Sequence, residues 1–185
     1  MSQKGRICEA NLKVGKVLIS QEQIQSRVKE LASRISLDYR EKDLLMVCIL
    51  KGAFMFLGDL LKHLSIPLKI DFMATSSYGR RTKTTGKVRI TKELEVDAHG
   101  RHVLVVEDIV DTGHTLKFIL DYLASKEPAS LKVCALLDKK ERREVPINID
   151  YVGFTIPNVF VVGYGLDYAE RYRNLPYVAS LVEED

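Results

Sequence analysis

The stretch from Val103 to Thr115, VLVVEDIVDTGHT, constrains the fold of this chain more than any other. It opens with four apolar residues, a pattern typical of a strand that is buried on both faces in a parallel sheet. Beyond it, apolar residues recur at helical spacing from Leu116 to Leu123, before a stop at Pro128. The turn Asp111 to Thr115 is therefore expected between the carboxyl end of a strand and the amino end of a helix, where open α/β sheets bind ligands.

The rest of the chain alternates expected strands with expected helices. Ser20 and Gln23 form a capping-box pattern that begins one helix, and a second helix is expected over Ala53 to Leu64. The other expected strands are Val14–Ile19, Leu44–Leu50, Pro67–Ala74, Ser130–Leu137, Tyr151–Phe154, Phe160–Val162 and Tyr177–Val182. This alternation predicts one α/β domain over residues 1–185, with a mostly parallel twisted sheet flanked by helices.

Composition excludes several classes of protein. The 28 Lys and Arg residues against 25 Asp and Glu give a net charge of +3, which does not demand a nucleic-acid partner, and no apolar run is long enough to cross a membrane. The amino terminus lacks the apolar core of a signal peptide, so a cytoplasmic protein is expected. The three cysteines and four histidines show no ligand spacing, and the sequence indicates no zinc site.

The charges of the central turn divide it into two parts. Glu107 and Asp108 repel phosphate, but they are good acceptors for the two hydroxyls of a ribose and indirect ligands for Mg²⁺. The N–H groups and hydroxyls from Thr112 to Thr115 suit a phosphate, and Gly113 allows a close approach of the backbone. No dinucleotide-binding or P-loop motif is present. The pattern indicates a sugar that carries a phosphate.

The same stretch resembles the signature of the type I phosphoribosyltransferases, enzymes that use 5-phosphoribosyl 1-pyrophosphate. Four further motifs occur in the order seen in hypoxanthine-guanine phosphoribosyltransferases: LKG at 50–52, SY at 77–78, LLDK at 136–139 and FVVGYGLDY at 160–168. The resemblance covers most of the chain and implies the type I phosphoribosyltransferase fold. In that fold a small hood of short strands, formed by the N-terminal segment and about residues 150–185, binds the purine.

The resemblance also implies a role for each matching residue. Asp111 is the expected catalytic base or acid at purine N7. The phosphoribosyl group is expected to contact Glu107, Asp108, Asp111, Thr112, Gly113, His114 and Thr115, the imidazole of His114 having no catalytic role. Pyrophosphate is expected at Lys51, Gly52 and Arg173, where the family often has a cis peptide bond after Leu50. The purine is expected at Lys139, Phe160, Val161 and Asp167, a lid contributes Ser77 and Tyr78, and Mg²⁺ is expected at Glu107, Asp108 and Asp167.

The implied function is purine salvage. A Mg²⁺-dependent pentosyltransferase would transfer the 5-phosphoribosyl group to hypoxanthine or guanine and release IMP or GMP and pyrophosphate. The resemblance implies a homodimer or homotetramer, with no nucleic-acid or membrane partner. Two alternatives stay open: a xanthine-preferring phosphoribosyltransferase, and a non-catalytic RNA-binding regulator on the same fold. Asp111 together with Lys139 and Phe160 favours the enzyme, because a regulator has no need of a general base.

Simpler structural roles compete with these assignments. Asp111 could cap the following helix, and Lys139 could belong to a solvated charged loop. Lys51 and Gly52 could form an ordinary tight turn, while Phe160 and Val161 could pack in the core. The polar segment 75–92, six of whose residues are basic, is the expected lid, but it could also be an exposed hairpin or a weak nucleic-acid patch.

Overall fold

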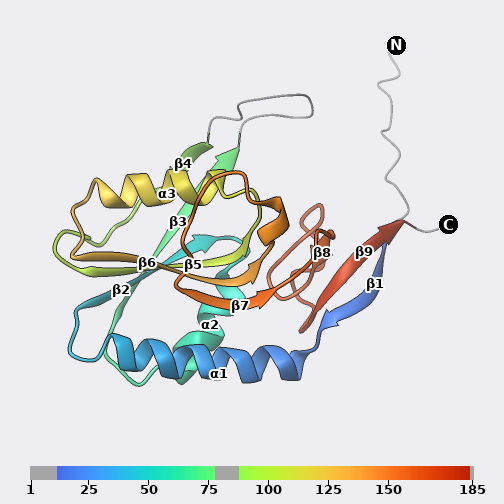
Figure 1. The fold of residues 1–185 in the computed structure, drawn as a ribbon, viewed down its shortest axis with the longest axis horizontal. Helices are drawn as coiled ribbons and strands as arrows, with labels where there is room; N and C mark the ends of the chain where they lie inside the picture. The colour runs from blue at the N-terminus through green and yellow to red at the C-terminus, as the bar shows by residue number, and fades with distance from the viewer. Residues whose placement is uncertain (1–11, 78–87, 184–185) are drawn as a thin grey trace, which may run out of the picture.

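A six-stranded sheet forms the body of the molecule (Figure 1). The computed structural model describes residues 12–77 and 88–183. In spatial order the strands are β4 (Val88–Lys92), β3 (Lys69–Ser77), β2 (Leu44–Leu50), β5 (His102–Val110), β6 (Ser130–Asp138) and β7 (Tyr151–Thr155). All neighbours are parallel except β3 and β4. The expected mostly parallel sheet is confirmed.

Helices cover both faces of this sheet (Figure 1). α1 (Gln21–Asp38) and α2 (Phe54–His63) pack on one face, and α3 (His114–Ala124) packs on the other. The capping box that begins α1 is present: the N–H of Gln23 donates to Ser20 Oγ at 3.3 Å, and the N–H of Ser20 donates to Gln23 Oε1 at 2.8 Å. Two of the donors that a helix start leaves unpaired are thereby satisfied.

Strand β2 is apolar at every position, because it faces a core on each side of the sheet. Leu44, Met46 and Cys48 belong to the core that contains α1 and α2, whereas Leu45 and Val47 belong to the core that contains α3. Because side chains alternate between the faces of a strand, the part of a strand that is covered by helices on both sides is apolar at successive positions.

The two described cysteines are core residues. Cys48 and Cys134 are free and buried, and burial raises the pKa of the Cys48 thiol to about 12. Both thiols therefore pack as small apolar groups in the protonated state.

A second, three-stranded sheet joins the two ends of the chain. Its order is β1 (Leu12–Ile19), β9 (Val178–Glu183) and β8 (Val161–Val162), with all neighbours antiparallel. It corresponds to the hood of short strands that the resemblance implied. The hydroxyl of Tyr164, in the turn after β8, donates to Asp59 Oδ2 of α2 at 2.6 Å. This bond ties the hood segment to the body of the molecule.

The expected lid segment, residues 75–92, begins and ends in strands. Thr75 to Ser77 complete β3, and Val88–Lys92 form β4, which pairs antiparallel with β3. In β4 the apolar Val88 and Ile90 alternate with the more exposed Arg89 and Thr91, which is the signal of an edge strand. Residues 78–87, with Tyr78, lie outside the described part of the chain, and closure of a lid stays a prediction.

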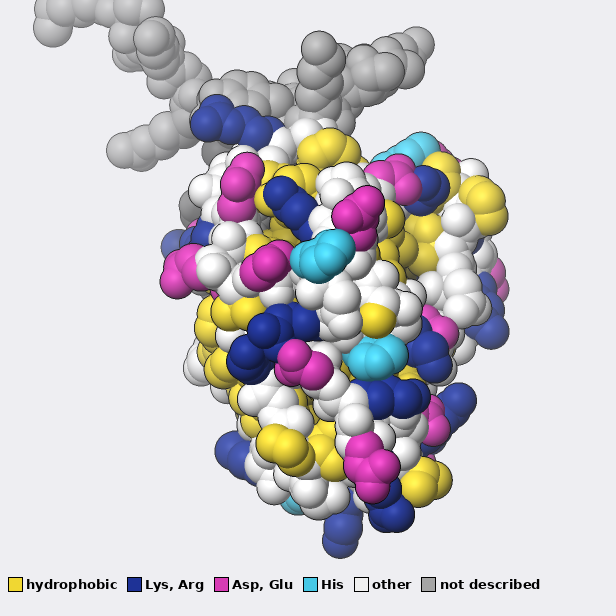
Figure 2. Space-filling view, turned by 90° about the vertical axis from the view of Figure 1, so that its left-hand side faces the viewer, with side chains coloured by type: hydrophobic (Ala, Val, Ile, Leu, Met, Phe, Trp, Pro, Cys, Tyr) yellow, Lys and Arg dark blue, Asp and Glu magenta, His cyan; other side chains and the backbone are white. Residues whose placement is uncertain are grey.

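Basic and acidic side chains are interspersed on the face drawn in Figure 2, and no patch of a single charge covers it. This mixture agrees with the small net charge of the chain. None of the helices that the structure describes combines the length and the apolar composition needed to cross a membrane.

Candidate active site

The expected site residues gather where three parallel strands end. Lys51 and Gly52 follow β2, Asp111 follows β5, and Lys139 follows β6. Because these strands are neighbours in the sheet, residues far apart in the sequence meet at its carboxyl edge.

Asp111 does not cap α3. The residue before the helix is Gly113, which has a φ of +92° and makes no capping hydrogen bond through a side chain. Asp111 Oδ1 instead accepts a hydrogen bond from Arg142 Nε at 3.0 Å, and Oδ2 lies 3.8 Å from Lys139 Nζ. The capping alternative is therefore excluded, and the carboxylate faces two cations.

Lys139 is not part of a solvated loop. Only 7% of the residue is exposed, and its backbone N–H donates to the carbonyl of Val110 at 3.0 Å. Burial lowers the pKa of the ammonium group, and the nearby carboxylate of Asp111 opposes this effect. An enclosed ammonium group next to Asp111 suits hydrogen bonding to a bound polar ligand.

The turn after β5 encloses a small cavity of about 170 Å³, whose lining includes Thr112, Gly113 and Thr115. It lies at the amino end of α3, where N–H groups lack partners within the helix. His114 points elsewhere: its side chain is exposed, and Nε2 lies 2.9 Å from Glu144 Oε2. Any contribution of His114 to an anion would come from its backbone N–H, as expected.

Glu107 and Asp108 lie within β5, near its end. The Oε2 atom of Glu107 is enclosed and has no hydrogen-bond partner among the described residues. Burial raises the pKa of Glu107 well above its usual value, with a further contribution from Asp108, and burial raises the pKa of Asp108 to about 6. An enclosed acceptor without a donor is costly to leave unpaired, and the raised pKa of Glu107 reflects this burial.

Gly52 is pressed against Asp108. A Cβ atom at position 52 would lie 1.5 Å from Asp108 Oδ2, so only glycine fits there. The peptide bond between Leu50 and Lys51 is cis, as the family often has it. On the other side, a Cβ at Gly165 would lie 2.0 Å from the carbonyl oxygen of Gly52. The loop after β2 therefore contacts both β5 and the hood segment, which excludes an ordinary surface turn.

Arg173 and Lys51 converge on one carboxylate that the sequence did not reveal. Arg173 Nη2 lies 2.8 Å from Asp167 Oδ1 and 3.4 Å from Glu170 Oε2. Lys51 Nζ lies 3.0 Å from the same oxygen of Glu170, and this contact, together with Arg173, lowers the pKa of Glu170. Glu170 thus bridges the two cations expected to bind pyrophosphate. Its position three residues before Arg173 was the only signal in the sequence.

Phe160 and Val161 differ in burial, which separates the two roles considered for them, purine binding and core packing. Val161 is buried in β8, whereas Phe160 is 52% exposed and packs edge-on against Tyr168, with ring centroids 5.8 Å apart. Phe160 is therefore not a core residue. Within the described ranges, no hydrogen bond, ion pair or ring contact joins Phe160 to Asp111 or Lys139.

The expected metal ligands do not form a preformed metal cage. In residues 12–77 and 88–183, no three His, Cys, Asp or Glu side chains are grouped so that they could hold a metal ion. Glu107 and Asp108 are adjacent in β5, and Asp167 is held by Arg173. This arrangement still suits Mg²⁺, which is commonly bound through one or two carboxylates together with substrate phosphates.

Comparisons with known proteins identify the family to which the chain is similar. Residues 20–169 match the family model of the phosphoribosyl transferase domain. The chain is 50% identical to a hypoxanthine phosphoribosyltransferase of Haemophilus influenzae, over 91% of this chain and 96% of that protein. It is 52% identical to a hypoxanthine-guanine phosphoribosyltransferase of Mycobacterium tuberculosis, over 89% and 85%. A crystal structure of a hypoxanthine phosphoribosyltransferase from Staphylococcus aureus superposes with a TM-score of 0.88 at 48% identity, over 91% of this chain and 92% of that one.

Proposed function

The chain belongs to the phosphoribosyltransferase family, in its hypoxanthine-guanine branch, and we propose that it transfers the 5-phosphoribosyl group from phosphoribosyl pyrophosphate to hypoxanthine or guanine. The products are IMP or GMP and pyrophosphate, which makes the protein a purine salvage enzyme. The observation that carries the proposal is the pair of Asp111 and Lys139, 3.8 Å apart beside the turn that begins α3.

In this proposal Asp111 and Lys139 each interact with a different atom of the purine. The bond from ribose C1 to pyrophosphate breaks as a purine nitrogen attacks C1, and the base then has to lose a proton. The Asp111 carboxylate accepts this proton at N7, and Lys139 donates a hydrogen bond to the exocyclic O6. Phe160, exposed on the hood segment, offers a ring on which the purine stacks.

The sugar and the leaving group have separate partners. Glu107 and Asp108 accept hydrogen bonds from the ribose hydroxyls, and the backbone from Thr112 to Thr115 binds the 5′-phosphate. Lys51 and Arg173 neutralise the pyrophosphate, which requires both cations to leave Glu170 when substrate binds. The pair of Lys51 and Glu170 is exposed on both sides, and such exposed salt bridges are worth only about 0–1 kcal/mol.

Mg²⁺ is part of the proposal. Asp167, Glu107 and Asp108 are the carboxylates that would hold it, alongside the phosphates of the substrate. The ion, when bound, neutralises charge that develops on the leaving pyrophosphate.

The direct test mixes the protein with phosphoribosyl pyrophosphate, Mg²⁺ and each of hypoxanthine, guanine and xanthine in turn, and follows pyrophosphate release. We expect turnover with hypoxanthine or guanine and a higher kcat/KM for one of these than for xanthine. A higher kcat/KM for xanthine than for hypoxanthine and guanine would instead support the alternative of a xanthine-preferring phosphoribosyltransferase. The absence of turnover with all three bases would contradict the proposed enzymatic function and favour the alternative of a non-catalytic RNA-binding regulator.

We also propose that the enzyme works as a homodimer or homotetramer. Light scattering coupled to size exclusion gives the mass directly, for comparison with 21.0 kDa for one chain. A mass near that of one chain at assay concentration would contradict this part of the proposal.

A further inference from the structure

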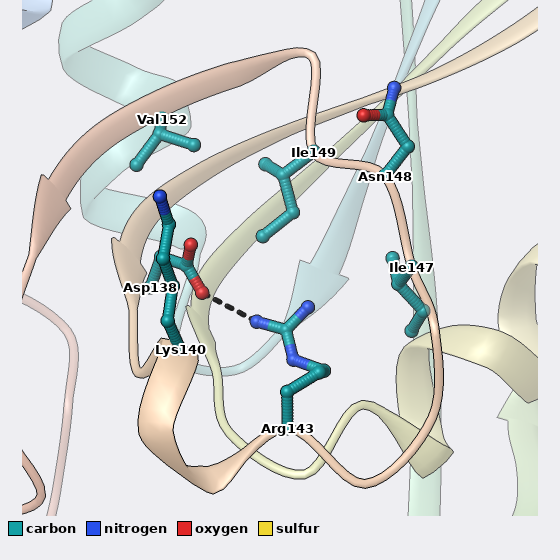
Figure 3. A pocket seen from close by; sticks show the side chains of 7 residues that line it. All are labelled: Asp138, Lys140, Arg143, Ile147, Asn148, Ile149 and Val152. Carbon is teal, nitrogen blue, oxygen red and sulfur yellow. Dashed lines mark hydrogen bonds and ion pairs between the residues drawn. The ribbon is translucent and has the colours of Figure 1, made fainter.

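A buried ion pair lies directly behind the phosphate turn. Asp138 is the last residue of β6 and pairs in register with Val110, the last residue of β5. Its carboxylate forms an ion pair with Arg143, which follows the short helix η1 (Lys140–Arg142) after β6 (Figure 3). The side chains of Arg143 and Asp138 are only 16% and 5% exposed. A pair so enclosed is held by its surroundings and resists exchange with solvent.

Arg143 also donates hydrogen bonds to the turn itself. Its Nε donates to the carbonyl of Asp111 at 3.1 Å, and Nη2 lies 3.4 Å from the carbonyl of Val110. The next two residues complete the series, because the N–H groups of Glu144 and Val145 donate to the carbonyl of Thr112 at 3.0 and 3.3 Å. Three consecutive carbonyls of the turn are thus pinned by three consecutive residues.

Packing reinforces these bonds. A Cβ atom at Gly113 would lie 2.9 Å from Val145, 3.0 Å from Ile147 and 3.1 Å from Arg143. The turn therefore has no room to move toward this segment. The aliphatic part of Arg143 contributes to the packing in addition to its charge.

Pinning the carbonyls decides where the N–H groups point. In a trans peptide unit the C=O of one residue and the N–H of the next point in opposite directions. When the carbonyls of Val110, Asp111 and Thr112 face Arg143 and its neighbours, the N–H groups of residues 111–113 face away from it. That is the orientation a phosphate requires, and rotation of any of these peptides would turn a repelling oxygen toward the anion instead.

We propose that Arg143, held by Asp138, is a positioning residue for the phosphoribosyl substrate. Its side chain holds the carbonyls of Val110 and Asp111, while the N–H groups of Glu144 and Val145 hold the carbonyl of Thr112. Arg143 thereby helps to orient the N–H groups of the phosphate turn and fixes the point from which the Asp111 carboxylate projects. The inference rests on the proposed function for the identity of the ligand. The neighbouring Lys140 provides the contrast: it lines the cavity behind the turn in Figure 3, yet its side chain is exposed and contacts none of the three carbonyls.

The test measures binding apart from turnover. The Kd of ribose 5-phosphate is determined by calorimetry, and kcat and KM are determined for phosphoribosyl pyrophosphate and hypoxanthine. The proteins compared are wild type, Arg143→Met, Arg143→Lys, Asp138→Asn and the control Lys140→Met. Thermal melting confirms that each variant is folded at the assay temperature.

We expect Arg143→Met to raise the Kd of ribose 5-phosphate and the KM of phosphoribosyl pyrophosphate by about tenfold to a hundredfold, as misplacement of a positioned group does. The KM of hypoxanthine should change by much less. Arg143→Lys keeps the charge but loses the fork of donors, so it should recover only part of the loss, and Asp138→Asn should show the same pattern in weaker form. Lys140→Met, which also removes one positive charge, should match wild type.

Two results would overturn the proposal. One is a folded Arg143→Met or Arg143→Lys variant whose ribose 5-phosphate Kd and phosphoribosyl pyrophosphate KM stay within about twofold of wild type. The other is an equal loss in Lys140→Met, which would reduce the effect to net charge. Should Arg143→Met fail to fold, Arg143→Lys and Asp138→Asn still decide between these outcomes. If wild type binds ribose 5-phosphate without turnover, the proposed enzyme fails, while the comparison of Kd values still tests Arg143.

Discussion

Asp111 lies between two cations that differ in how firmly they hold it. Arg142 has a side chain that is 45% exposed, whereas the side chain of Lys139 is 8% exposed. Ion pairs in water contribute little, so Arg142 can leave the carboxylate at small cost when a purine arrives, and Lys139 stays beside it. One carboxylate can thus be paired before substrate binds and serve as a base afterwards.

Replacement of Asp111 by Asn tests this role at the scale of one residue. The amide keeps the shape of the side chain but accepts no proton, so kcat should fall by about a hundred- to ten-thousand-fold, with the KM values within a few-fold of wild type. Steady-state kinetics with hypoxanthine measures both quantities. The matched control is Asp121→Asn, an exposed acid of α3 that pairs with Lys117. Unchanged kcat in Asp111→Asn would remove Asp111 from the mechanism.

The sequence predicted those site residues whose neighbours in the chain carry a pattern. Asp111 was predicted from the apolar strand and the turn around it, whereas Lys139 was predicted from the family resemblance; both lie at the carboxyl edge of the sheet. Glu170 and Arg143 escaped prediction, because their roles depend on where a loop returns in space. Nothing in the local sequence indicates that Glu170 meets Lys51, which precedes it by 119 residues.

Strand β5 combines an apolar run, Val103 to Val106, with two adjacent acids, Glu107 and Asp108. Its first part lies in the core, while Glu107 and Asp108 carry carboxyl groups whose pKa values burial raises. The folded chain therefore holds protons that the unfolded chain has already lost. For Asp108 this difference extends from its ordinary value of 3.8 up to about 6, and for Glu107 it begins at 4.5 and continues well above that. Across this range the free energy of unfolding falls as pH rises.

Glu107→Gln should remove the part of this pH-dependent loss of stability that comes from Glu107. Without ligand, the variant should melt above wild type at pH 8 by about 2–6 °C, equivalent to roughly 1–2 kcal/mol in a chain of this length. The difference in melting temperature between the variant and the wild type should become smaller toward pH 5, because the raised pKa of Glu107 keeps more of it protonated in the folded wild type there. Scanning fluorimetry from pH 5 to pH 8 measures it, with Glu30→Gln, an exposed acid of α1, as the control. A gap that does not depend on pH would contradict the assignment.

Elements were predicted well where one physical pattern dominated. Continuous apolar runs predicted strands β2, β5 and β6, and a capping box predicted the start of α1. The sequence predicted β4 only as part of the polar segment 75–92. In an edge strand with one solvated face, apolar residues alternate with polar ones, and here only Val88 and Ile90 show that pattern. Strand pairing, rather than composition, makes it a strand.

At the scale of the whole molecule, the hood segment and the body meet at two glycines. Gly165, with a φ of +98°, lies so close to the carbonyl of Gly52 that any side chain would collide with it. Arg173 holds the same turn by donating to the carbonyl of Gly165 at 2.8 Å. The residues expected to bind the purine and those expected to bind pyrophosphate are therefore joined through one close backbone contact.

Gly165→Ala should separate the hood segment from the body. A methyl group there meets the Gly52 carbonyl and strains a positive φ, so the KM values of phosphoribosyl pyrophosphate and of the purine should both rise, by about tenfold or more. The matched control is Gly58→Ala in α2, where no atom lies within 4 Å of the new methyl group. This control should keep full activity and gain about 0.5–1 kcal/mol of stability. Equal KM values in Gly165→Ala and wild type would show that the contact is not needed.

The contact between Gly52 and Asp108 has a consequence for the history of the sequence. A side chain at position 52 would occupy the space of the Asp108 carboxylate, so position 52 cannot gain a side chain while Asp108 is kept. A lineage that acquires alanine at 52 must shift the loop or give up the carboxylate, and with it a contact to the ribose. Among descendants that keep aspartate at 108, position 52 should therefore stay glycine, although the two residues are 56 positions apart along the chain.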